Sequence, residues 1–294
     1  ICHVFKSGFV NIIGYPNAGK STLINSLLND KLSIITEKAQ TTRHKIIGIE
    51  NTNNYQLIFT DNPGFTKPSN IIHEYMNKKV KESILDGDII LYVVDLSSKS
   101  IEYVDLNEKL KKIKVPLIIV LNKIDKVDQQ ILENISSKWK TEFNNAEIWT
   151  TSALNKFNVE NLKERIIELL PEGPKYFPDD QWTDKSERFF VNEIIREKIF
   201  KYYKEEIPYS SEVVTEKFKY RNKVFRICSS IIVERNSQKA IIIGNKGSSL
   251  KKVASQSRTD LEKFFNQKVF LEINVKVVKD WRKKSQQLKN FGYN

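Results

Sequence analysis

The sequence has 294 residues and a mass of 34.3 kDa, which corresponds to about two domains of ordinary size. Its 40% hydrophobic and 29% charged residues are typical of a globular protein, and no apolar run reaches the roughly 18 residues that a membrane-spanning helix needs. Two cysteines, Cys2 and Cys228, stand too far apart to predict a thiolate metal site or a disulfide framework. We therefore expect a reducing compartment, and the first residues show no secretory signal.

The net charge of +12 is concentrated in the second part of the chain. Residues 1–175 hold 23 Lys and Arg against 21 Asp and Glu, whereas residues 176–294 hold 25 against 15. This segregation favours contact of the C-terminal part with a polyanion, either nucleic acid or an acidic membrane surface. A basic surface that only contacts solvent is the alternative.

Through residue 170, short β-branched runs alternate with longer segments of helical period. The expected strands are Phe9–Ile13, Lys45–Glu50, Tyr55–Thr60, Asp88–Val94, Pro116–Asn122 and Glu147–Thr151. The expected helices are Lys20–Leu28, His73–Leu85, Tyr103–Ile113, Gln129–Phe143 and Val159–Leu170. This alternation predicts an α/β domain with a mostly parallel sheet and helices on both faces.

The segment Pro171–Asp180 holds three prolines and a glycine in ten residues, which disfavours both helix and strand. We interpret it as the interdomain linker, with domains at 1–172 and 186–294 and the linker at 173–185. The second domain is expected to be an α+β layer. Its elements are expected at Arg188–Tyr203, Ser211–Tyr220, Val224–Glu234, Ala240–Ile243, Ser248–Phe265 and Val269–Val278.

The segment from Gly14 to Ser21 matches the phosphate-loop pattern GxxxxGK[ST], between the strand FVNII and the helical segment STLINSLL. Its glycines let the backbone wrap around phosphate oxygens, and amide N–H groups at the helix start supply positive potential. Lys20 would neutralise the β and γ phosphates, and Ser21 would ligate magnesium. The alternative is a glycine-rich turn between strand and helix that binds nothing.

Asn122-Lys123-Ile124-Asp125 closes a strand at the carboxyl edge of the sheet, where α/β folds bind ligands. The carboxylate of Asp125 can accept hydrogen bonds from the N1–H and the exocyclic amine of guanine, which adenine does not offer. Asn122 would bridge the base and the phosphate loop, and a backbone N–H in Ser152-Ala153-Leu154 would reach the guanine O6. The motif therefore favours GTP over ATP.

Asp61-Asn62-Pro63-Gly64 ends another strand. Its carboxylate can hold the magnesium shell, and the Gly64 N–H can reach the γ phosphate. Thr41 or Thr42 could place a hydroxyl on the metal. Together with the two preceding motifs, this order resembles the translation-factor-related GTPases over residues 9–170.

Phe65 stands where GTPases of the Ras type carry the Gln that orients the attacking water. A benzyl side chain cannot make that hydrogen bond, and this departure resembles the hydrophobic-substituted GTPases. That resemblance implies that Asn17 helps hold a potassium ion where an arginine finger would otherwise lie. The alternatives are that Asn17 only shapes the loop, and that the chain binds guanine nucleotide with little hydrolysis.

Gly244-Asn245-Lys246-Gly247 joins a short apolar helix to a long helical segment in a unit with three strands. This setting resembles a KH domain, in which the GxxG loop presses single-stranded nucleic acid against an apolar groove. Lys251 and Lys252 follow, and residues 236–289 hold 13 basic against 4 acidic residues. The alternative is a glycine turn with a solvated basic face.

The segments GYPNAGKST, KAQTTRH, DNPG and VERNSQKAIIIGNKGSSLKK together resemble the Era family over nearly the whole chain. The resemblance implies a P-loop GTPase domain followed by a type II KH domain, with GTP or GDP, Mg²⁺ and K⁺ as ligands. It also implies binding to the 3′ end of 16S ribosomal RNA, assistance to small-subunit maturation, and a KH groove that nucleotide state controls through switch segments between Ala39 and Phe65. We expect a monomer in the bacterial cytoplasm or at the inner face of the plasma membrane, although no basic amphipathic helix favours the membrane.

The resemblance implies a residue set for each ligand. Phosphate contacts are expected at Gly14, Asn17, Ala18, Gly19, Lys20, Ser21, Thr22, Asp61 and Gly64. Guanine contacts are expected at Asn122, Lys123, Asp125, Ser152, Ala153 and Leu154, and magnesium ligands at Ser21, Thr42 and Asp61. RNA contacts are expected at Gly244, Asn245, Lys246, Gly247, Lys251 and Lys252. The chain departs from the family at Asn62, usually Thr, and at Ala18, frequently Val.

Two further features have open interpretations. Trp281, followed by Arg282, Lys283 and Lys284, would either stack on RNA or pack in the core. His3, His44 and His73 have no companions at metal or triad spacing and are expected to be structural or solvent-exposed.

Overall fold

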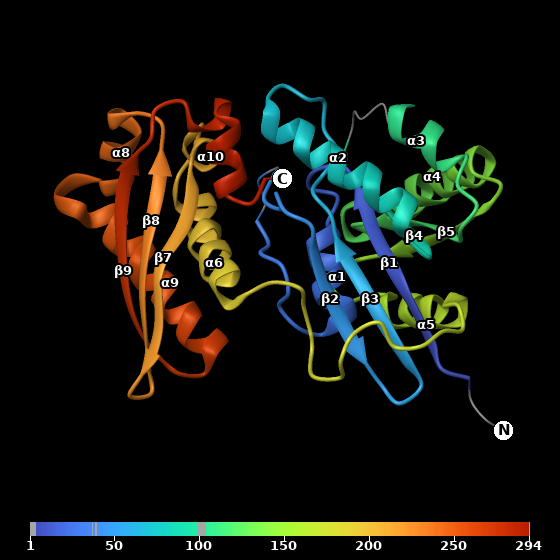
Figure 1. Ribbon diagram of the computed structural model, residues 1–294. Coiled ribbons are helices and arrows are strands. Elements are labelled where there is room, and N and C mark those ends of the chain that lie inside the picture. The colour runs from blue at the N-terminus through green and yellow to red at the C-terminus, as the bar shows by residue number, and fades with distance from the viewer. Residues whose placement is uncertain (1–3, 37, 39, 99–103, 294) are drawn as a thin grey trace. The chain divides into compact units, whose positions relative to one another are not determined.

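The computed structural model describes residues 4–36, 38, 40–98 and 104–293. The chain divides into two compact units (Figure 1). The first holds the residues up to Ser69 together with His73–Asp184, and the second holds Asn70–Ile72 together with the residues from Lys185. Cys2, His3, Ala39 and Tyr103, which figure in the predictions above, lie outside the described residues.

The first unit is built on a six-stranded sheet among its described residues, in the order β2-β3-β1-β4-β5-β6. The strands are β1 (Lys6–Gly14), β2 (Ile46–Asn51), β3 (Tyr55–Asp61), β4 (Ile89–Asp95), β5 (Leu117–Asn122) and β6 (Ala146–Thr151). β2 and β3 form an antiparallel pair, and the other neighbours are parallel. The mostly parallel sheet predicted from the sequence is therefore confirmed.

Helices cover both faces of this sheet. They are α1 (Lys20–Leu28), α2 (Ile71–Asp86), α3 (Val104–Leu110), α4 (Gln129–Glu142) and α5 (Val159–Leu169), with a 3-10 turn at Ile124–Lys126. Ile90, Tyr92 and Val94 of β4 share a core with side chains of α2, α3 and α4. The β4 residues between them are equally buried and face the other way, and α1 contacts β1, β3 and α5. Strands buried on both faces need helices on both sides.

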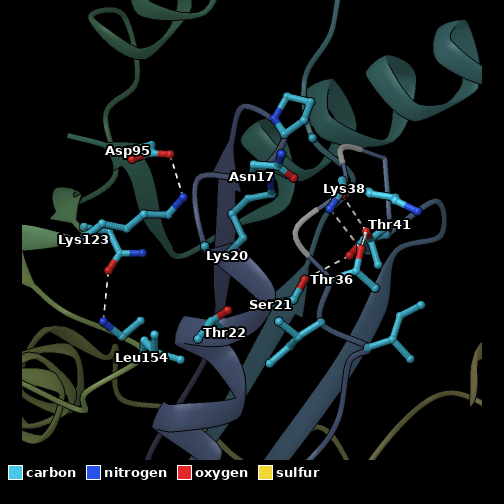
Figure 2. A pocket seen from close by; sticks show the side chains of 18 of the residues that line it. Asn17, Lys20, Ser21, Thr22, Thr36, Lys38, Thr41, Asp95, Lys123 and Leu154 are labelled. Atoms are coloured by element: carbon cyan, nitrogen blue, oxygen red, sulfur yellow. Dashed lines mark hydrogen bonds and ion pairs between the residues drawn. The ribbon is translucent and has the colours of Figure 1, made fainter. Parts of the chain in front are cut away.

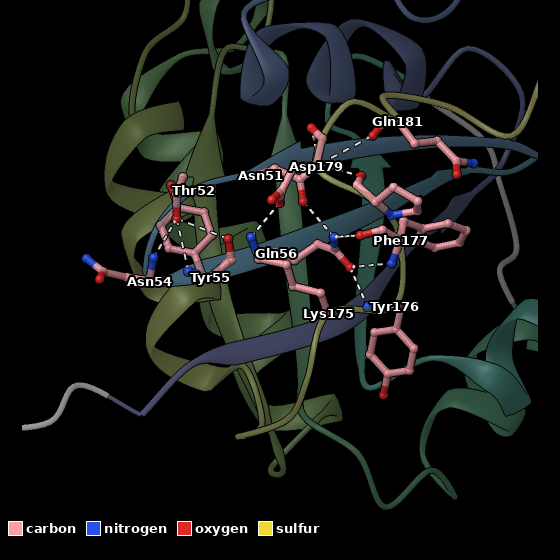
Figure 3. A network of polar contacts seen from close by, with 11 residues as sticks. Asn51, Thr52, Asn54, Tyr55, Gln56, Lys175, Tyr176, Phe177, Asp179 and Gln181 are labelled. Atoms are coloured by element: carbon pink, nitrogen blue, oxygen red, sulfur yellow. Dashed lines mark hydrogen bonds and ion pairs between the residues drawn. The ribbon is translucent and has the colours of Figure 1, made fainter.

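Residues 171–184, which we call the strap, lie against the first unit in the structure (Figure 3). The side chain of Gln56 on β3 is fully buried beneath them. Its Oε1 accepts hydrogen bonds from the backbone N–H of Tyr176 at 2.7 Å and Phe177 at 3.0 Å, and its Nε2 donates to the Phe177 carbonyl at 2.8 Å. One carboxamide thus satisfies three backbone groups of the strap.

The later part of the strap runs along the free edge of β2. The Ile49 N–H donates to the Trp182 carbonyl at 2.9 Å, and Gly48 pairs with Thr183 in an antiparallel bridge. The Ile47 N–H donates to a carboxylate oxygen of Asp184 at 2.9 Å. Most of the segment predicted as a linker, 173–185, is therefore docked on the first unit, although its prolines keep it in turns, bends and isolated bridges.

The second unit contains the helix-strand-strand-helix-helix-strand order predicted from the sequence pattern, with α7 and α10 in addition. Its elements are α6 (Glu187–Tyr202), α7 (Ile207–Ser210), β7 (Glu212–Arg221), β8 (Val224–Val233), α8 (Asn236–Ile243), α9 (Ser248–Phe265), β9 (Lys268–Val277) and α10 (Ser285–Asn290), with 3-10 turns at Asn245–Gly247 and Trp281–Lys283. β8 lies between an antiparallel β7 and a parallel β9. Apolar residues of α6, α9 and the three strands form its core.

The structure settles the position of Trp281. Its side chain is fully buried, and its indole N–H donates to the Ser210 carbonyl at 3.2 Å. Trp281 is therefore a packing residue, and the interpretation that it stacks on RNA is wrong because no face of the ring reaches the surface. Throughout the described residues, no helix has the length and apolar character needed to cross a membrane.

Candidate nucleotide and RNA sites

The phosphate loop follows β1 and leads directly into α1. Asn17 and Gly19 both have left-handed backbone conformations, with φ of 63° and 93°. A Cβ on Gly19 would lie 2.2 Å from the side-chain nitrogen of Asn122, so only glycine fits there. The loop therefore curls tightly at the carboxyl edge of the sheet, with the amino end of α1 facing its interior.

A cavity of about 640 Å³ opens at this edge (Figure 2). The predicted residues that line it are Asn17, Gly19, Lys20, Ser21, Thr22, Thr41, Thr42, Gly64, Asn122, Lys123, Asp125, Ala153 and Leu154. The predicted residues that do not line it are Gly14, Ala18, Asp61 and Ser152, of which the last three are each hydrogen-bonded to a residue that does. The structure thus brings the predicted phosphate, magnesium and guanine residues to one site.

Lys20 lies inside the loop with only 6% of its surface exposed. Its Nζ donates to the Tyr15 carbonyl at 2.8 Å. Burial lowers the pKa of Lys20 to about 8, against the opposing effect of the Asp61 charge. A bound phosphate group would place negative charge beside this ammonium and so favour the protonated form of Lys20.

Ser21, Thr42 and Asp61 come from three different segments and meet at one point. The Ser21 hydroxyl donates to a carboxylate oxygen of Asp61 at 2.7 Å and lies 2.9 Å from the Thr42 hydroxyl. Two hydroxyls and a carboxylate are hard oxygen donors of the kind that Mg²⁺ prefers. The residues present therefore fit the predicted magnesium site.

The segment after β3 passes directly over the phosphate loop. A Cβ on Gly64 would lie 2.6 Å from the backbone nitrogen of Pro16, so glycine is required for this approach. The Phe65 N–H donates to the Gly14 carbonyl at 3.0 Å. The Phe65 ring is 9% exposed and packs edge-to-face on Tyr15, with centroids 5.9 Å apart. Phe65 thus belongs to the core of this unit, and that it does not act on water stays a prediction.

Asn62, which departs from the family pattern, is completely buried. Its Oδ1 accepts a hydrogen bond from the Ser83 hydroxyl at 2.7 Å, and its Nδ2 donates to the Ile12 carbonyl at 3.1 Å. The side chain therefore ties the end of β3 to β1 and to α2.

Asn122 joins the loops on the guanine side. Its Nδ2 donates to the Ala18 carbonyl at 2.9 Å, and its Oδ1 accepts from the Ala153 N–H at 3.0 Å. The Ser152 hydroxyl donates to the Asp125 carboxylate at 2.5 Å. The bond from Ser152 thus fixes the orientation of the Asp125 carboxylate. Asp125 itself lines the cavity.

Asp95 was not among the residues predicted from sequence, yet it lines the same cavity. Its carboxylate forms an ion pair with Lys123 at 2.6 Å (Figure 2). No motif marks Asp95, but it ends the strand IILYVVD at the edge where parallel strands place ligand contacts. That position is the signal that could have identified it.

The GxxG loop in the second unit separates α8 from α9. Gly244 and Gly247 both have positive φ, 72° and 77°. A Cβ on Gly244 would lie 2.2 Å from the Ser249 hydroxyl, whereas nothing lies within 4 Å of a Cβ on Gly247, which faces open space. Asn245, Lys246, Lys251 and Lys252 are all exposed at this loop and the start of α9. The loop thus offers an open backbone surface flanked by cations, as a phosphodiester chain requires.

Two family models match the chain: one described as 50S ribosome-binding GTPase over residues 9–123, and a KH domain over residues 206–282. The GTPase Era of Syntrophus aciditrophicus is 45% identical over 99% of this chain and 96% of its own length. The chain belongs to the Era family of GTPases. The Era protein of Clostridium kluyveri is 44% identical over 99% of this chain and its own full length.

Solved Era structures match both units. An Era from Aquifex aeolicus bound to GDP·AlF4⁻ has a TM-score of 0.93 and 37% identity, covering 98% of this chain and 99% of its own. An Era complex with MgGDPNP and nucleotides 1506–1542 of 16S ribosomal RNA has the same score, identity and coverage. The predicted family, the P-loop GTPase domain with a KH domain, and GTPase activity are thereby confirmed.

Proposed function

We propose that this GTPase binds the 3′ end of 16S ribosomal RNA through its KH domain and assists maturation of the small ribosomal subunit. The observation that carries the proposal is the open GxxG loop, in which Gly247 faces free space beside exposed lysines. The Era complex that contains nucleotides 1506–1542 of that RNA supports the choice of partner.

The phosphate and metal contacts are proposed from the geometry of the cavity. Ser21, Thr42 and Asp61 would hold Mg²⁺, which neutralises negative charge on the phosphate oxygens when bound. Lys20 and the amide groups at the start of α1 bind the phosphates, and the Gly64 N–H orients the terminal one. With these groups fixed before the nucleotide enters, little reorganisation is needed at the moment of hydrolysis.

The base contacts are proposed on the other side of the cavity. Asp125 would accept hydrogen bonds from the guanine N1–H and amine, with Ser152 holding the carboxylate in place. Lys123 would lie along the base, and the Leu154 N–H would reach O6. The Ala153 N–H donates to Asn122, which also holds the phosphate loop.

The GxxG assignment is tested with full-length protein and a labelled RNA that ends in the 3′ sequence of 16S RNA. The double substitution Asn245→Asp and Lys246→Asp, in the middle of the GxxG loop, adds negative charge where the RNA phosphates would lie. We expect RNA affinity to fall about tenfold or more. The matched control is Asn222→Asp with Lys223→Asp, the same residue pair in the exposed turn between β7 and β8.

Equal losses in the two double variants would mean that only general charge is involved, and no loss in either would remove the KH loop from RNA binding. GDP affinity, measured on each variant, reports on the first unit.

We propose that the protein acts as a monomer in the bacterial cytoplasm. Sedimentation with anionic liposomes would reveal the alternative location at the membrane.

A further inference from the structure

Asp95 and Asn122 are neighbours at the carboxyl edge of the sheet. They end β4 and β5 and are paired in the parallel register of these strands. Lys123 follows Asn122 with a left-handed φ of 67°, and its side chain extends toward Asp95 (Figure 2). The ammonium group ends 2.6 Å from Oδ2 of Asp95.

The Lys123 side chain is therefore directed to Asp95 along the lining of the cavity rather than into solvent. Its Cε lies 4.0 Å from the position of a Cβ on Gly19, so the methylene chain passes over the phosphate loop. The Lys123 side chain is 24% exposed and that of Asp95 is 13% exposed. Both residues line the cavity, so the stem presents an apolar surface to whatever occupies it.

Asp95 is itself held from the other side. Its Oδ1 accepts hydrogen bonds from the Ser97 N–H at 2.9 Å and the Ser97 hydroxyl at 2.6 Å, which leaves Oδ2 for Lys123. Burial alone would raise the pKa of Asp95, but the hydrogen bonds from Lys123 and Ser97 outweigh it and hold the pKa below its ordinary value. The group is thus a fixed carboxylate.

We propose that Asp95 is a positioning residue of the guanine subsite. It holds the Lys123 ammonium at the rim, which lays the methylene stem along the place of the purine ring. It also keeps that ammonium from pairing with Asp125, whose carboxylate lines the same cavity and must stay available to guanine. A lysine has four rotatable side-chain bonds, so without an anchor its ammonium would reach many other positions.

This inference rests on the proposed guanine contacts, and the test separates the two. Calorimetry on the full chain with Mg²⁺ would compare GDP with inorganic tripolyphosphate, a probe that has phosphates but no base. In Asp95→Ala and Asp95→Asn we expect GDP affinity to fall, by about tenfold in the alanine variant. Tripolyphosphate affinity should stay within about twofold, which also shows that the phosphate loop is folded. Asp30→Ala, an exposed aspartate outside the cavity, is the control.

A double-mutant cycle identifies the partner. In a Lys123→Met background, Asp95→Ala should change GDP affinity by no more than about twofold, because the group that Asp95 positions has gone. Full additivity of the two substitutions, unchanged GDP affinity in Asp95→Ala, or equal loss of both probes would each overturn the role. If the wild-type chain bound GDP no better than tripolyphosphate, the guanine site itself would be misassigned.

Discussion

Asn17 is the residue at which the structure makes the potassium hypothesis testable. Asn17 and Gly64 both line the cavity. The ring of Phe65, which follows Gly64, is buried and provides no group that could polarise water. We propose that K⁺ bound near Asn17 supplies the missing positive charge. Hydrolysis should then be faster in potassium than in sodium salts at equal ionic strength.

The choice of variant at Asn17 depends on its backbone. Because φ is 63°, alanine would add backbone strain, whereas glycine adopts this conformation freely. Asn17→Gly should therefore abolish most of the potassium response, and GDP affinity measured alongside reports any change in the phosphate contacts of the loop. An unaltered ratio of rates in the two salts would show that Asn17 only shapes the loop.

Site residues inside sequence motifs could be predicted because each motif fixes both chemistry and place. The phosphate loop and the Asn122–Asp125 segment both contribute residues to the cavity, and their ligand contacts stay predictions. Asp95 could not be found in this way, because a single carboxylate at a strand end has no distinctive neighbours. The burial of Trp281 was also undecided, because its basic neighbours suited both interpretations.

At the scale of elements, the strap is held by several side chains of the first unit, and Gln56 is the completely buried one that bonds Tyr176 and Phe177. Replacing Gln56 by leucine leaves the N–H groups of Tyr176 and Phe177 and the Phe177 carbonyl without their partner. These groups are partly buried, so each loss costs at most about 1–3 kcal/mol. We expect Gln56→Leu to release the strap, and trypsin to cleave after Lys175 faster than in the wild type.

Mass spectrometry of the fragments would locate the cleavage. Gln130→Leu, an exposed position on α4, is the control for the loss of a glutamine. A strap that resists trypsin equally in both variants would show that edge pairing with β2 holds it without Gln56.

Long periodic elements could be read from the sequence, and short ones could not. α7 and α10 were not predicted: α7 is four residues long, and α10 is a polar run in which Leu288 is buried. α8 begins earlier than expected, because the Gln238 side chain accepts hydrogen bonds from the N–H groups of Glu234 and Arg235 and caps the helix. The docking of the strap depends on distant partners, which composition does not reveal.

For the whole molecule, the proposed switch makes a thermodynamic prediction. If bound GTP raises the affinity of the KH domain for RNA, RNA must raise the affinity for GTP by the same factor. Binding of the 16S fragment should be measured with a nonhydrolysable GTP analogue and with GDP, and each nucleotide should then be titrated with and without RNA. Equal RNA affinity in the two nucleotide states would refute the switch, although each site could still bind its ligand.

The excess of basic residues in 176–294 favoured contact of this part of the chain with a polyanion. In the structure, part of this excess positive charge lies on the exposed lysines around the GxxG loop. Charge alone could not have chosen between RNA and a membrane. The KH fold favours RNA, because its glycine loop is shaped for a nucleic acid backbone.

The docking of the strap changes what joins the two halves of the chain. A free coil of 13 residues would have a root-mean-square span of about 20 Å. Here Asp184 is bonded to β2 and α6 starts at Glu187, so only Lys185 and Ser186 lie between them, a stretch that reaches at most about 7 Å. Its anchor is the start of β2, a few residues after Thr42. A shift of β2 would therefore be transmitted directly to the start of α6, because two residues allow little independent movement.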